Sequence, residues 1–188
     1  MHVVLLCDAY PPEVRSASLL TYDFATGLRD RGHRVTVVTT YPRYNLPTEA
    51  PKDGYPPDAV EEGIYVIRIA TMPIKRVSLV RRGIGELLLP YQFAARAIQL
   101  VRGPVDIIEV YSPPLPLSLA GWAMKRHFGC PLVVNVQDLF PQNAVDLGLV
   151  RNPLVLAGLL TLERMAYGVA DAMTVHSPGN RDFLIAHR

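Results

Sequence analysis

The chain has 188 residues, of which 49% are hydrophobic and 19% charged, so it is long and apolar enough for one domain with a buried core. A net charge of +2 is far below that of a dedicated nucleic-acid-binding domain, and we expect no nucleic-acid partner. Two cysteines make no disulfide framework and no Cys/His group has metal-ligand spacing, so we expect no metal and no cofactor.

No apolar run reaches the roughly 18 residues of a membrane-spanning helix, and the first run, Met1–Leu6, is too short for a signal-peptide core. These features predict a cytoplasmic protein that is soluble or at most peripheral to a membrane.

Short apolar runs alternate with longer amphipathic stretches along the chain. Strands are predicted at Val3–Cys7, Val35–Thr40, Ile64–Ile69, Asp106–Tyr111, Pro131–Val136 and Ala172–His176. Helices are predicted at Ser18–Arg31, which Gly32 suits as a left-handed cap, and roughly at 83–102, 116–128, 153–169 and 179–187. Continuous β-branched runs indicate strands buried on both faces, so the fold class is α/β: a doubly wound, mostly parallel, Rossmann-like sheet with helices on both faces. Residues 41–62, rich in proline and charge, are predicted as a long loop that is either functional or a spacer.

Ligands of such sheets bind beyond the carboxyl ends of the strands. After the first strand comes Tyr10, and then the start of a helix at Arg15, Ser16 and Ala17. A helix N-terminus with a cation beside it suits a phosphate. The alternative for this segment is a helix capped by Ser16 or Ser18 beside an exposed arginine.

Residues 75–102 carry many basic side chains among leucines and aromatic residues. Basic and apolar groups together suit an anionic membrane surface, whereas the alternative is a core helix with a solvated basic rim. The membrane interpretation names four arginines, Arg76, Arg81, Arg82 and Arg96.

Three later turns also follow predicted strands. Ser112 and Pro113 begin a rigid proline turn, and Ser177 precedes a proline as a natural helix cap. Gln137 and Asp138 follow the fifth strand, where a carboxylate is able to orient a sugar hydroxyl or accept its proton. A helix cap is the alternative role for Asp138.

These turns together resemble the N-terminal domain of GT-B glycosyltransferases of the group-1, or GT4, family. The resemblance extends over nearly the whole chain in the order of its motifs: Tyr10-Pro11-Pro12-Glu13, Leu28–Val35, Ser112-Pro113-Pro114, Val136–Pro141, Glu163-Arg164, Ala170–Val175 and Ser177-Pro178-Gly179. The Gln-Asp-Leu-aromatic-Pro version is similar to transferases that build bacterial surface polysaccharides such as O-antigens of lipopolysaccharide.

The resemblance implies retaining transfer from a nucleotide-sugar donor to a glycan or lipid-linked acceptor, without a metal. It implies that residues 1–188 form the acceptor-binding domain, with Tyr10, Ser112, Pro113 and Ser177 near the acceptor and Asp138 and Gln137 as the catalytic candidates. The donor diphosphate would meet Arg15–Ala17, where relatives usually have paired glycines. The partner nucleotide-sugar domain, with its two glutamates, lies outside this sequence, so these residues alone are expected to be inactive.

Two other classes of function stay open at this stage. One is a non-catalytic Rossmann-like module that binds a sugar or nucleotide. The other is a nucleotide-dependent oxidoreductase, which the missing G-x-G-x-x-G fingerprint disfavours. A second α/β domain with two glutamates eight positions apart, encoded beyond Arg188, would favour the transferase.

Overall fold

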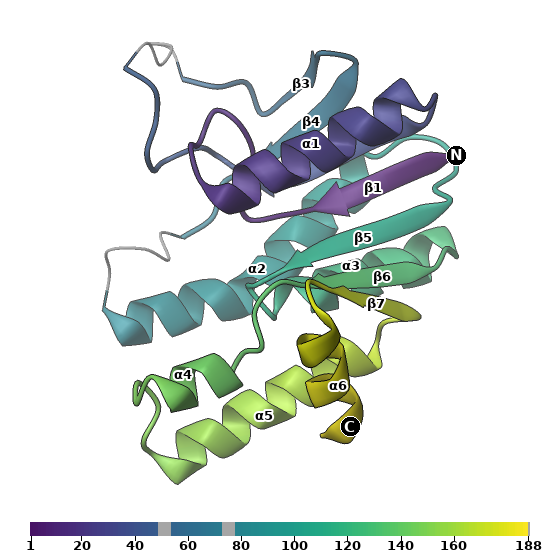
Figure 1. Cartoon of the computed structure of the whole chain (residues 1–188). Coiled ribbons are helices and arrows are strands. Elements are labelled where there is room, and N and C mark those ends of the chain that lie inside the picture. Colours follow the sequence, from purple (N-terminus) through teal and green to yellow (C-terminus); the bar gives the residue numbers. More distant parts are fainter. Residues whose placement is uncertain (49–53, 73–77, 188) are drawn as a thin grey trace.

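A computed structural model of the protein describes residues 1–48, 54–72 and 78–187, without the side chains of residues 79, 80 and 82. Its centre is a seven-stranded sheet (Figure 1). The strands are β1 (His2–Leu6), β2 (Arg34–Thr40), β3 (Asp58–Glu61), β4 (Ile64–Ile69), β5 (Ile107–Ser112), β6 (Leu132–Val136) and β7 (Ala172–Val175). The helices are α1 (Ser16–Asp30), α2 (Leu79–Leu100), α3 (Leu117–Phe128), α4 (Gln142–Asp146), α5 (Pro153–Gly168) and α6 (Pro178–Ala186).

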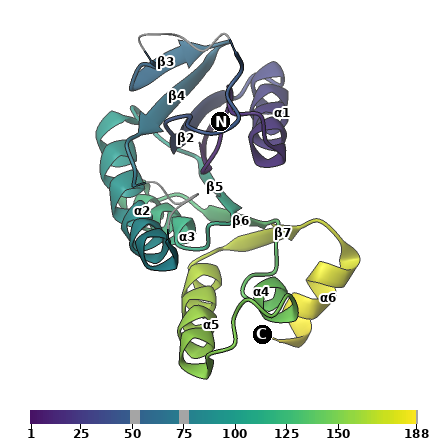
Figure 2. The same cartoon turned by 90° about the vertical axis from the view of Figure 1, so that its left-hand side faces the viewer.

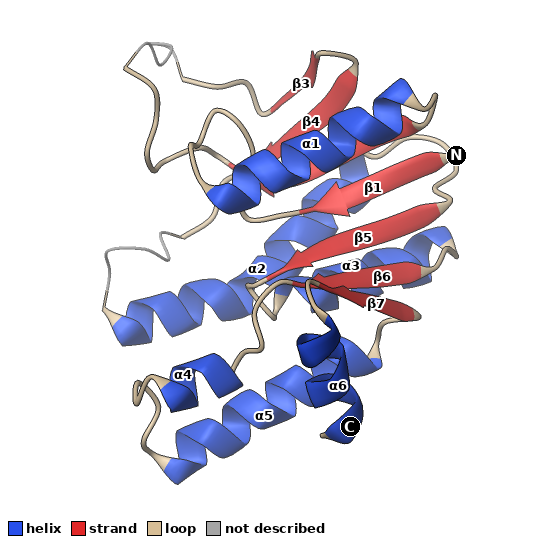
Figure 3. Ribbon diagram, viewed as in Figure 1, coloured by secondary structure: helices blue, strands red, loops and turns tan. Residues whose placement is uncertain are grey.

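The strand order is β3-β4-β2-β1-β5-β6-β7, and every neighbouring pair is parallel except β3 with β4. The chain runs outward from β1 through β2 to β4, then crosses to β5 and continues outward through β6 to β7 (Figure 3). The order therefore reverses between β1 and β5, which is where an open α/β sheet places its ligand.

Helices cover both faces of the sheet, with α1 and α6 on one side and α2, α3 and α5 on the other (Figure 2). Two apolar cores follow from this layering. The larger lies between the sheet and α2 and α3, around Phe93, Leu117 and Met124. The smaller lies under α1, against strands β1, β2 and β4. Strands buried on both faces explain the continuous apolar runs of the sequence.

Every predicted strand and helix is present, and the predicted α/β class is confirmed. The largest boundary shift is at α2, which begins at Leu79 instead of 83. Gly32 has φ +81° and donates its N–H to the carbonyl of Arg29, as predicted for the end of α1. Cys7 and Cys130 are free and buried.

Part of the predicted loop 41–62 is wrong, because Asp58–Glu61 pair antiparallel with β4 as an edge strand. Glu62 and Gly63 both have positive φ, the conformation that a two-residue hairpin turn requires. Residues 49–53 of the same segment lie outside the described part of the chain.

Two predicted helix caps are also wrong. Neither Ser16 nor Ser18 caps α1: the cap residue is Arg15, in extended conformation and without a side-chain capping hydrogen bond. Asp138 does not cap the next helix either, because α4 begins after Pro141 and receives no side-chain cap. Ser177 does cap α6, accepting the N–H of Asn180 at 3.2 Å.

Candidate functional site

The loop after β1 is held together by ion pairs around Arg15. The Arg15 guanidinium lies 3.0 Å from Asp8 Oδ1, and its Nε lies 3.2 Å from Glu13 Oε2. The other oxygen of Glu13 accepts the backbone N–H groups of Arg43 at 2.7 Å and Tyr44 at 3.1 Å. Glu13 thereby fastens the segment after β2 to the start of α1. Arg15 is mostly buried, so the exposed arginine considered from the sequence is wrong.

The ends of β5 and β6 form the opposite side of the site. The turn after β5 leads through three prolines into α3, and the backbone N–H of Gln137 donates to the carbonyl of Ser112 at 2.8 Å. This bond joins the two strand ends. Asp138 comes two residues after β6, and its side chain is exposed at this edge of the sheet.

A cleft of about 310 Å³ lies between these two sides, at the point where the strand order reverses. Five residues predicted for the site line it: Arg15, Ser16, Ala17, Pro113 and Asp138. Residues distant in sequence, from the loop after β1 and the turns after β5 and β6, are therefore brought together. Side chains of α2 and α5, Glu86 with Leu159 and Leu162, complete its walls.

Two groups in the cleft titrate away from their ordinary ranges. Burial raises the pKa of Asp8, although the charge and hydrogen bond of Arg15 oppose the shift. Burial also raises the pKa of Tyr111, and the negative charges of Asp8 and Asp138 add to the effect. Because Arg15 already faces two carboxylates, its positive charge is largely offset before any ligand arrives.

The remaining predicted acceptor residues and the catalytic candidate Gln137 lie outside the cleft. Tyr10 is buried under α1, with its ring centroid 6.1 Å from that of Tyr22. Ser112 is buried with 1% exposure, and the hydroxyl of Ser177 is engaged in capping α6. Gln137 points away from the cleft into a neighbouring hollow on the α1 side of the sheet.

The predicted membrane-facing arginines are only partly described. Arg76 lies outside the described residues, and for Arg82 the backbone alone is described. Arg81 is exposed in the first turn of α2, and Arg96 donates to Gln99 at 3.0 Å. Between them the exposed side of the helix is apolar and includes Ile84, Leu87, Leu88 and Tyr91.

Sequence reasoning missed several residues that build this edge of the sheet. Asp8 comes directly after the predicted strand Val3–Cys7, and a position after a buried strand is also the signal that identified Asp138. Glu13 lies within the motif Tyr10-Pro11-Pro12-Glu13. Tyr111 was predicted only as the end of a strand, although it lines the cleft. Within the described ranges, no group of three or more His, Cys, Asp or Glu side chains could hold a metal ion. None of the described helices is both long and apolar enough to cross a bilayer.

Comparison with known proteins identifies a sequence family and solved structures with a similar fold. Residues 17–188 match the family described as glycosyl transferase 4-like domain. Apo UGT2 of Phytolacca americana is similar in structure, with a TM-score of 0.57 and 14% identity over 94% of this chain and 45% of that one. The alpha,alpha-trehalose 6-phosphate synthase of Burkholderia multivorans gives a TM-score of 0.51 and 16% identity over 92% of this chain and 38% of that one. The chain thus spans less than half the length of either. No curated protein matches it in sequence.

Proposed function

Because the chain belongs to the glycosyl transferase 4-like domain family and has the fold of the N-terminal half of GT-B glycosyltransferases, we propose that it is the acceptor-binding lobe of a retaining transferase. The reaction moves a sugar from a nucleotide-sugar donor to a glycan or lipid-linked acceptor, and it needs no metal. The second lobe holds the nucleotide, and these residues alone are inactive.

The cleft at the strand-order reversal is the observation that carries this proposal. It combines the start of α1, where backbone N–H groups point outward, with the carboxylate of Asp138 on the facing side. The N–H groups of Ser16 and Ala17 suit the donor diphosphate, since a helix N-terminus attracts anions. Arg15 positions this loop through its carboxylate partners instead of presenting a free charge.

Asp138 is the residue that we assign to the acceptor. An exposed carboxylate at the cleft accepts a hydrogen bond from an acceptor hydroxyl and so orients it toward the donor carbon. Gln137, the other catalytic candidate, contacts the acceptor from the neighbouring hollow. In this proposal Tyr10, Ser112 and Ser177 support the site through packing and capping.

The acceptor is lipid-linked and the lobe is peripheral to the cytoplasmic face of a membrane. The exposed apolar side of α2, together with Arg81, supports this part of the proposal. Glu86 of the same helix lines the cleft, so a bilayer against α2 would lie beside the acceptor site.

The test is sugar transfer by the protein expressed from its full reading frame. We expect transfer from one of a panel of UDP-, GDP- and dTDP-sugars to lipid-linked acceptors in a membrane extract, with retained anomeric configuration by NMR and no loss in EDTA. Asp138→Asn should lower kcat/KM about 100-fold, the loss that misplacement of a reacting group can cause. Asp146→Asn, an exposed aspartate of α4 bonded to Gln142, is the matched control.

Binding of a sugar or nucleotide without turnover would instead favour the non-catalytic module. Equal losses in the two aspartate variants would show that Asp138 has no special role.

A further inference from the structure

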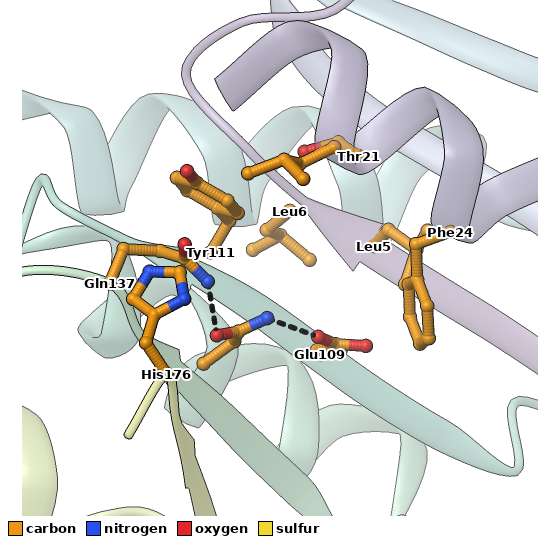
Figure 4. Close-up of a pocket in the computed structure, with 10 residues that line it drawn as sticks. Leu5, Leu6, Thr21, Phe24, Glu109, Tyr111, Gln137 and His176 are labelled. Carbon is orange, nitrogen blue, oxygen red and sulfur yellow. Dashed lines mark hydrogen bonds between the residues drawn. The ribbon is translucent and has the colours of Figure 1, made fainter. Parts of the chain in front are cut away.

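A second hollow lies beside the cleft, on the face of the sheet that α1 covers only in part. It has a volume of about 210 Å³ between α1 and strands β1, β5 and β6 (Figure 4). One side is apolar, with Leu5, Leu20 and Phe24, whereas the floor is polar. Tyr111 lines both this hollow and the cleft, so the two spaces meet at its ring.

The polar floor is a directed chain of hydrogen bonds. Gln137 Nε2 donates to Asn135 Oδ1 at 2.5 Å, and Asn135 Nδ2 donates to Glu109 Oε1 at 3.3 Å (Figure 4). An amide nitrogen carries two hydrogens and a carboxyl group has two oxygens, so these bonds leave donors and acceptors along the chain for a ligand. The amides are thus held in place before any ligand binds.

The charge of the hollow selects among ligands. None of its ten lining residues is a lysine or arginine; the imidazole of His176 is the only basic side chain among them, and Glu109 brings the only carboxyl group. Burial raises the pKa of Glu109, although the hydrogen bond from Asn135 opposes this shift. The raised pKa favours the neutral carboxyl group, which is able to donate a hydrogen bond. A phosphate or carboxylate ligand would meet no lysine or arginine side chain in the hollow and would lie beside the carboxyl group of Glu109, whereas a neutral hydroxylated ligand would find both donors and acceptors.

The apolar side of the hollow adds a second requirement. Phe24 is 45% exposed, and its ring lies beside Glu109, at the end of the hydrogen-bonded chain away from Gln137 (Figure 4). A ligand that fits needs an apolar face toward the ring and hydroxyl groups toward the floor. The volume is below the about 300–1,000 Å³ of pockets for drug-sized ligands, so it suits a single ring.

We propose that this hollow is a binding subsite for one neutral pyranose ring, held between Phe24 and the hydrogen-bonded chain of Glu109, Asn135 and Gln137. The proposal rests on the acceptor-binding function and sharpens it: the ring belongs to the acceptor, and Tyr111 separates it from the reacting hydroxyl in the cleft.

The experiment is an NMR titration of the 188-residue chain with free glucose, galactose, mannose and N-acetylglucosamine. At about 50 mM a ligand with millimolar Kd nearly saturates its site. We expect one of these sugars to shift the side-chain amide signals of Asn135 and Gln137, whereas inorganic phosphate should leave them unmoved. Asn135→Leu should weaken the affinity at least about tenfold. Asn143→Leu, at an exposed asparagine of α4, should bind as the unchanged chain does.

Three outcomes would overturn the subsite. They are no shift with any of the sugars, equal weakening by the two asparagine variants, or an Asn135→Leu chain that is more stable while no sugar binds, which would assign the hollow to packing against another segment. The transfer assay does not depend on where in the lobe the acceptor ring binds, so the two experiments test different claims. An active full-length transferase without these shifts therefore refutes this inference alone, and a chain that binds a sugar without any transfer refutes the transferase alone.

Discussion

At the scale of single residues, the carboxylates of Asp8 and Glu13 have different partners in the loop after β1. Glu13 is 3% exposed and joins Arg15 to the backbone of residues 43 and 44, whereas Asp8 pairs with Arg15 at the wall of the cleft. A carboxylate that is buried, ion-paired and hydrogen-bonded to the backbone is costly to remove, because its partners are left without an acceptor.

Glu13→Ala should therefore lower the free energy of unfolding by about 3 kcal/mol, because Arg15 loses one partner and two backbone N–H groups lose their acceptor. Urea denaturation measures the change. Asp30→Ala removes a carboxylate that is 66% exposed and paired with Arg29, so this control should change stability by less than about 0.5 kcal/mol. Similar values for the two variants would show that Glu13 does not fasten the loop.

Glu109 predicts a pH dependence. Its pKa is raised above the ordinary 4.5 by burial, so the folded chain binds this proton more tightly than the unfolded chain does. Stability from this group is present below pH 4.5 and is lost as the pH rises through the raised folded value. Glu109→Gln, which has no such proton, should therefore gain stability relative to the unchanged chain as the pH rises above 4.5. Denaturant unfolding at a series of pH values from 4.5 upward tests the sign, and a constant difference would contradict it.

Residues of the site differ in how well the sequence predicts them. Arg15–Ala17 and Asp138 were predicted to lie at the ligand edge because they follow buried strands, and the structure places them on one cleft. Glu109 and Asn135 are polar residues within otherwise apolar strands. Whether their side chains line a hollow that is open to a ligand depends on which part of the sheet face α1 leaves uncovered. The sequence of these strands contains no information on that coverage.

At the scale of elements, α3 packs close to the sheet at a glycine. A Cβ atom at Gly121 would lie 2.7 Å from Val110 Cγ2 and 2.8 Å from a methyl of Leu132, closer than real contacts allow. Small residues at such positions set the distance between a helix and the strands under it.

Gly121→Ala should therefore destabilise the chain by about 1–3 kcal/mol through overpacking, despite the better helix propensity of alanine. Gly158→Ala in α5 is the matched control, since its Cβ would meet nothing within 4 Å and should stabilise the helix by up to about 1 kcal/mol. Thermal unfolding of both variants measures the two changes in stability. If both substitutions stabilise the chain, α3 is able to move away from the sheet without loss of stability, and the overpacking argument is wrong.

Elements with a strong hydrophobic period were the predictable ones. β3 was missed because Pro56 and Pro57 precede it and it lies at the sheet edge, where only one side is paired. α4 has five residues, too few to show a helical period. β3 depends on its pairing with β4, whereas α4 is bonded to the turn that precedes it, where the N–H of Asn143 donates to the carbonyl of Leu139.

At the scale of the whole molecule, the cleft lies between α2 and α5, and both helices carry exposed apolar side chains on their outer surfaces. On α2 these are Ile84, Leu87, Leu88 and Tyr91, and on α5 Leu154 and Val155. The α2 surface lies near Arg81 and, in sequence, near the other predicted arginines. The first turns of α5 contain no basic residue, and Arg151, just before this helix, donates to the carbonyl of Gly148. The combination on α2 is the one that anionic lipid attracts.

The α2 surface therefore predicts binding to vesicles that contain anionic lipid. In a sedimentation assay the double variant Leu87→Ser with Tyr91→Ser should lose most of the binding, because these side chains, 67% and 76% exposed, bury apolar area in the interface. Arg81→Gln should weaken binding by a factor of about five, since each basic residue near such a surface contributes about 1 kcal/mol, and the effect should shrink at high salt. Leu154→Ser, at a leucine that is 82% exposed on α5, controls for general surface hydrophobicity. If Leu154→Ser reduces binding as much as the double variant does, the attraction is not specific to α2, and a membrane beside the cleft is no longer supported.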